Sequence, residues 1–64
     1  MKIAQIMRID LINIAKASIA AGTMIGTPEL TAVLDALTTA GPYTEATDDE
    51  VDAFDDASEA AEIF

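Results

Sequence analysis

Hydrophobic residues recur at helical spacing in three segments of the chain, and short stretches containing glycine or proline separate these segments. Apolar residues at positions i, i+3, i+4 and i+7 lie on one face of an α-helix. The pattern predicts helices over residues 3–21, 28–40 and 48–63, with connectors near 22–26 and 41–46. We therefore expect an all-α, three-helix fold in which the whole chain makes one small domain.

The first segment is apolar on more than one side. Its main apolar face is expected to hold Ile3, Met7, Leu11, Ile14 and Ala21, with Ala4 and Ala15 flanking it. Ile9, Ile12 and Ile19 lie on the opposite side, where a monomeric three-helix protein would carry polar residues. Either the helix is buried on two sides, or it offers a second contact surface, since an exposed apolar surface usually marks an interface. These three isoleucines are therefore the candidate residues for self-association or for docking on a larger scaffold.

A second interpretation of the same segment is a β-strand over residues 7–13. Met7, Ile9 and Leu11 alternate there with Arg8 and Asp10, as expected for a half-buried strand. A lone strand of this kind would need a partner strand from another subunit. The sequence leaves both interpretations open.

The second segment has a clear beginning and a clear end. Thr27 is suited to cap the helix, Pro28 to occupy its first position, and Glu29 to lie beside its positive end. A single apolar stripe follows, made of Leu30, Val33, Leu34 and Leu37. Gly41 and Pro42 then end the helix, because proline restricts its predecessor and has no N–H to donate. The stripe predicts core packing.

The third segment begins with a capping box, in which Thr47 and Glu50 satisfy each other's backbone N–H groups. Phe54 is the one large anchor for the middle of this helix. The apolar face holds Val51, Phe54, Ser58 and Ala61, widened by Ala53, Ala57 and Ala60. The opposite face, a candidate surface for a protein partner, holds Asp48, Asp52, Asp55, Asp56, Glu59 and Glu62.

Charge is distributed unevenly along the chain, which has a formal net charge of −9. Lys2, Arg8 and Lys16 all lie in the first quarter, whereas eight acids lie within residues 48–62. Such a protein repels phosphates, so we expect no direct binding of nucleic acid and no binding to anionic membranes. The expected partner is a protein with a basic surface.

The acidic segment has a charge density close to that of nucleic acid. Eight acids over about 21 Å give roughly 2.6 Å per charge, against about 1.7 Å along duplex DNA. The charge density is thus within a factor of two of the duplex, so this helix could occupy the basic groove of a nucleic-acid-binding protein, as a small inhibitor or regulator of the kind that bacteriophages encode would do. The simpler alternative is a solvated face that keeps a small protein soluble.

The composition argues against catalysis and against bound cofactors. The chain has no histidine and no cysteine, which removes the usual general base, thiol nucleophile and zinc ligands. No glycine follows Gly41, so the acids cannot form the glycine-centred loop of an EF-hand calcium site. We expect no enzyme activity, no cofactor and no metal site.

Size and hydropathy bear on assembly and on location. A chain of 64 residues is near the lower limit for an independent core, and oligomerisation would help to complete it. Arg8 and Asp10 interrupt the apolar region that a signal peptide would need, and no apolar run reaches the roughly 20 residues of a membrane span. We expect a cytoplasmic protein. Two functional hypotheses follow: docking of the acidic helix on a basic partner, or assembly through the isoleucine-rich first helix.

Overall fold

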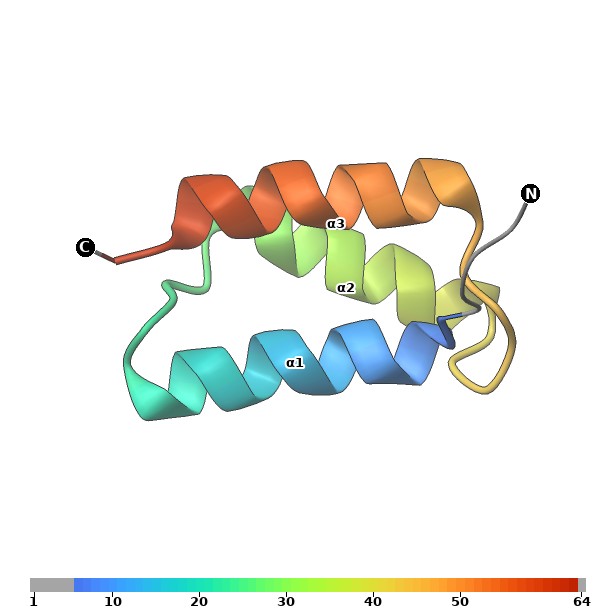
Figure 1. Ribbon diagram of the computed structural model, residues 1–64, viewed down its shortest axis with the longest axis horizontal. Coiled ribbons are helices and arrows are strands. Elements are labelled where there is room, and N and C mark those ends of the chain that lie inside the picture. Colours follow the sequence, from blue (N-terminus) through green and yellow to red (C-terminus); the bar gives the residue numbers. More distant parts are fainter. Residues whose placement is uncertain (1–5, 64) are drawn as a thin grey trace.

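Three α-helices form the fold of the computed structural model, which describes residues 6–63. These are α1 (Arg8–Ala21), α2 (Pro28–Ala40) and α3 (Asp48–Ala61). Figure 1 shows that α1 and α3 run in the same direction and that α2 returns between them. Helix α2 packs against both of the other helices. The prediction of an all-α fold is confirmed.

Local capping chemistry sets where α2 and α3 begin. The Thr27 hydroxyl accepts the backbone N–H of Leu30 at 3.1 Å, and Pro28 occupies the first helical position, as predicted. The predicted capping box of α3 is also present. The Glu50 N–H donates to the Thr47 hydroxyl at 3.2 Å, and the Thr47 N–H donates to the Glu50 carboxylate at 2.8 Å. Both helix starts were therefore predictable from their own residues.

The first helix begins later than the sequence pattern suggests. Ile6 and Met7 are not helical, and residues 3–5 lie outside the described part of the chain. The Ala46 N–H donates to the Ile6 carbonyl at 2.7 Å, and the Arg8 N–H donates to the Thr44 carbonyl at 2.9 Å. These bonds hold the segment before α1, Ile6 and Met7, against residues 44–46. The alternative interpretation, a strand over residues 7–13, is wrong: residues 8–13 are helical, and Met7 makes only an isolated bridge with Glu45.

A second backbone bridge closes the opposite end of the bundle. Helix α3 ends at Ala61, two residues before the predicted end, because the chain then becomes extended. The Ile25 N–H donates to the Ala61 carbonyl at 2.8 Å, and the Ile63 N–H donates to the Thr23 carbonyl at 3.1 Å. Met24 and Glu62 lie opposite each other in this bridge. Each end of the bundle is therefore closed by hydrogen bonds between distant segments.

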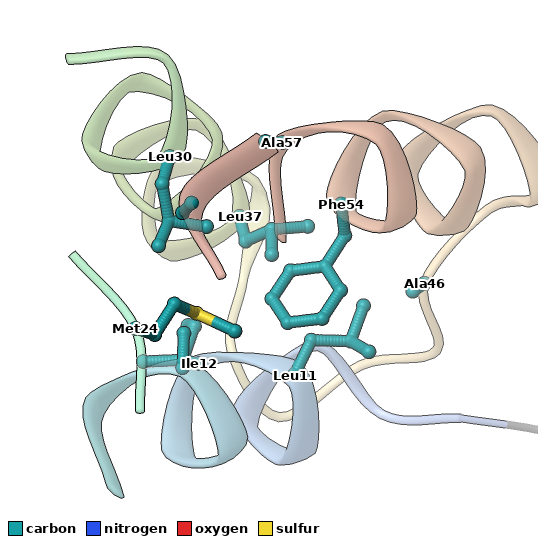
Figure 2. Packing of buried hydrophobic residues seen from close by; sticks show 10 residues of the cluster. Leu11, Ile12, Met24, Leu30, Leu37, Ala46, Phe54 and Ala57 are labelled. Carbon is teal, nitrogen blue, oxygen red and sulfur yellow. The ribbon is translucent and has the colours of Figure 1, made fainter. Parts of the chain in front are cut away.

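The core lies between the three helices and contains apolar side chains from every element. Phe54 is 5% exposed, and Figure 2 shows its ring reaching from α3 toward Leu11 of α1, beside Leu37 of α2. The predicted stripe of α2 is confirmed, because Leu30 and Leu37 are buried and Val33 and Leu34 pack against them. The core residues are Leu11, Ile12, Ala15, Met24, Leu30, Leu37, Ala46, Phe54, Ala57 and Ala61.

Helix α1 is rotated relative to its predicted orientation. Leu11 and Ala15 are buried as expected, but Ile12 is 3% exposed and Ile14 is 53% exposed. In this orientation the Arg8 side chain points toward the ends of α2 and α3. Ile12 lies one helical turn after Arg8 and so faces the same way, into the core. The placement of Ile12 on a second surface is therefore wrong.

Candidate functional site

The acidic face of α3, the candidate partner surface, lies on the side of that helix away from the core. Phe54, Ala57 and Ala61 are buried on the opposite side. All six predicted acids are exposed, and within residues 6–63 none of them forms an ion pair: Asp48, Asp52, Asp55, Asp56, Glu59 and Glu62. The helical period that buries the apolar residues of α3 is what collects these carboxylates on one side.

Glu50 differs from the acids of this face. Its Oε1 atom accepts the Arg8 Nε–H at 2.9 Å as well as the Thr47 N–H. The backbone N–H of Thr47 is the largest influence and lowers the pKa of Glu50; burial opposes it, and the hydrogen bond and charge of Arg8 lower the pKa further. Glu50 therefore stabilises the fold and is not part of the partner surface.

Arg8 is one of the three basic residues near the N-terminus, and its guanidinium group binds other parts of the same chain. Its side chain is 12% exposed. Besides Glu50, its Nη1 donates to the carbonyl oxygens of Gly41 at 3.3 Å and Ala40 at 3.4 Å, and to the Thr44 hydroxyl. No local pattern indicates this role, because the partners of Arg8 lie more than 30 positions away in the chain.

The charge density of residues 48–62 stays close to that of nucleic acid when Glu50, which pairs with Arg8, is left out. Asp49 is also exposed, which leaves seven exposed acids between positions 48 and 62. Their spacing is about 3 Å per charge, against about 1.7 Å along duplex DNA. Among residues 6–63, no three acidic side chains are grouped so that they could hold a metal ion. No helix in this part of the chain is long and apolar enough to cross a membrane.

The alternative interface on α1 does not form one surface. Ile12 is in the core, Ile9 is partly buried, and Ile19 alone is exposed, at 37%. The structure instead exposes apolar residues that periodicity did not identify, notably Ile25 at 55% and Ile63 at 50%. Ile25 lies in the connector before α2, and Ile63 lies beyond the end of α3, although the sequence pattern placed position 63 within that helix.

Comparisons with known proteins found no relative of this chain. No family model, no curated protein and no solved structure matches the chain. Its function is therefore inferred from the surface of the folded chain and from the charges and side chains found there.

Proposed function

We propose that this chain is a non-enzymatic protein-binding module that docks the acidic face of α3 on a basic surface of a partner protein. The observation that supports it is that the two sides of α3 differ: its apolar side packs in the core, whereas the six acids of the opposite face form no ion pair within residues 6–63. Crowding like charges on one helix costs stability through self-repulsion. A basic partner would relieve that cost on binding.

The partner best matched to this surface is a protein whose basic groove binds nucleic acid. Such a groove holds cations along a ladder of phosphates, and the exposed acids repeat at less than twice the phosphate charge spacing, about 3 Å against about 1.7 Å. Occupation of the groove would block nucleic acid, so the module would act as an inhibitor or regulator. Because complementary charge fields are screened by salt, the complex should weaken markedly as ionic strength rises.

Assembly through α1, the second hypothesis from the sequence, has less support. It required Ile9, Ile12 and Ile19 to lie together on an exposed surface. Ile12 packs in the core, so two copies cannot pair through all three side chains while the fold stays intact. The acidic face retains all six of its predicted residues at the surface.

Affinity capture from a lysate of the host organism, with the chain as bait, tests the proposal. The variant bait carries Asp52→Lys, Asp55→Lys and Asp56→Lys, three exposed positions whose change should leave the circular dichroism spectrum unchanged. We expect the wild-type chain to retain a basic protein that the variant loses and that is released by 0.5 M salt, where the Debye length is only about 4 to 5 Å.

A matched control variant distinguishes the effect of where the charges lie from the effect of the net charge. Asp10→Lys, Glu29→Lys and Asp35→Lys change three exposed acids on α1 and α2 and give the same net charge. This control, once shown to be folded, should still capture the partner. Equal capture by the wild-type chain and by the α3 variant would refute the proposal.

A further inference from the structure

Three exposed isoleucines gather at the end of the bundle where α3 stops. We call Ile19, Ile25 and Ile63 the end patch; they are 37%, 55% and 50% exposed. The backbone bridge between residues 23–25 and 61–63 brings the last two together. Ile19 lies beside Gly26, because its Cδ1 is 3.8 Å from the position that a Cβ on that glycine would take. Figure 1 shows this connector and the C-terminal end at the same end of the molecule.

The bridge directs the isoleucines away from the core. Met24 is buried, and successive side chains in extended backbone point to opposite sides, so Ile25 points outward. Ile63 follows Glu62, the residue that pairs with Met24, just as Ile25 follows Met24. The two isoleucines therefore leave the bridge on the same side, as diagonal neighbours.

The end patch lies at the end of the bundle where the acidic face of α3 also ends. Glu59 and Glu62 are the last acids of that face, and Glu62 is joined directly to Ile63. We infer that the end patch binds the same partner as the acidic face, and that this partner is a protein whose basic groove ends in an apolar contact surface. This inference rests on the proposed function and names the residues that anchor the complex.

A second copy of the chain is a poor occupant of the end patch. Each chain carries a net charge of −9, and the patch borders Glu59 and Glu62, so two facing patches would bring like charges together. Three isoleucines are also too few for a standard interface, which buries about 800 Å² per partner, or roughly a fifth of this chain's surface. The apolar residues supply affinity, and the charges supply orientation and association rate.

Two synthetic peptides of equal length and equal positive charge test this inference by fluorescence anisotropy. One peptide is an amphipathic helix of lysine and leucine, and the other has every leucine replaced by serine. The wild-type chain should bind the leucine peptide at least about tenfold more tightly, the effect of one well-buried apolar contact. Ile25→Ser with Ile63→Ser should remove most of that advantage and leave affinity for the serine peptide within about twofold, because the acids are unchanged.

Control variants make the result specific. Ile14→Ser removes an equally exposed isoleucine from the middle of α1, and it should keep the preference for the leucine peptide. If the double variant is less stable than the wild-type chain, the single variants Ile25→Ser and Ile63→Ser replace it in the binding measurement. Equal binding of both peptides by the wild-type chain, or an unchanged preference in the Ile25 and Ile63 variants, overturns the inference alone. If reversing the charges of Asp52, Asp55 and Asp56 left the binding of both peptides unchanged, that result would instead contradict the proposed function.

Discussion

The Nε atom of Arg8 lies 2.9 Å from Oε1 of Glu50, and the same oxygen accepts the N–H of Thr47 at 2.8 Å. One carboxylate oxygen thus joins the start of α1 to the cap of α3. The other side of the guanidinium donates to the carbonyl of Gly41, just after α2. Three helix ends that are distant in the sequence therefore meet at the Arg8 side chain.

Removing Arg8 and Glu50 separately and together should show that the two side chains stabilise the fold jointly. Arg8→Gln and Glu50→Gln should each lower the free energy of unfolding, and the double variant should lose less than the sum, since either change alone breaks the shared contact. Urea denaturation measures all four proteins. Losses that simply add would show that the Arg8–Glu50 contact does not stabilise the fold.

The stability that Glu50 supplies should depend on pH in a defined direction. Its pKa is lowered in the folded state, chiefly by the Thr47 N–H and then by Arg8, from an ordinary value of about 4.3. The ionised carboxylate therefore stabilises the fold fully above that value, and the contribution is lost as pH falls through the lowered pKa. The difference in unfolding free energy between the wild-type chain and Glu50→Gln should be constant from pH 7 to about pH 5 and shrink below about pH 4. An equal difference at pH 3 and pH 7 would contradict this assignment.

Phe54 should be the side chain whose truncation harms the fold most. Phe54→Ala leaves a cavity between α3 and α1 and should cost about 3 to 4 kcal/mol. A chain of this length has a total stability of roughly 3 to 10 kcal/mol. If the stability of this chain is near the lower value, the variant should be largely unfolded. Tyr43→Ala is the control, because that ring is 76% exposed and its loss should change stability by less than about 0.5 kcal/mol. Thermal unfolding followed by circular dichroism compares them; similar melting temperatures would refute the placement of Phe54 in the core.

Two glycines in one connector should respond oppositely to alanine. Gly22 ends α1 with φ at +81°, where a side chain is strained, so Gly22→Ala should destabilise the fold by about 1 kcal/mol. A Cβ on Gly26 would meet only Ile19 at ordinary contact distance, so Gly26→Ala should stabilise by about 0.5 kcal/mol through the unfolded chain. Chemical denaturation of both variants checks the pair, and a loss at Gly26 equal to that at Gly22 would count against the capping geometry.

Features set by neighbouring residues were predictable from the sequence. The caps at Thr27 and Thr47, the end of α1 at Gly22 and the burial of Phe54 all follow from local chemistry and helical period. The exposed acids of α3 follow from the same period.

The start and rotation of α1 were not predictable. They go together with hydrogen bonds between residues 6–8 and 44–46, and with the contact of Arg8 with Glu50, 42 positions later. The end patch was missed for a related reason. Ile25 and Ile63 lie outside the helices, and a backbone bridge between distant segments brings them together.

An NMR titration of the ¹⁵N-labelled chain with the captured basic protein tests the central claim most directly. The account predicts that backbone amide shifts are largest at Asp52, Asp55, Asp56 and Glu59, extend to Ile25 and Ile63, and disappear on addition of competing duplex DNA. Shifts confined to α1, with the amides of α3 unchanged, would contradict docking through the acidic face.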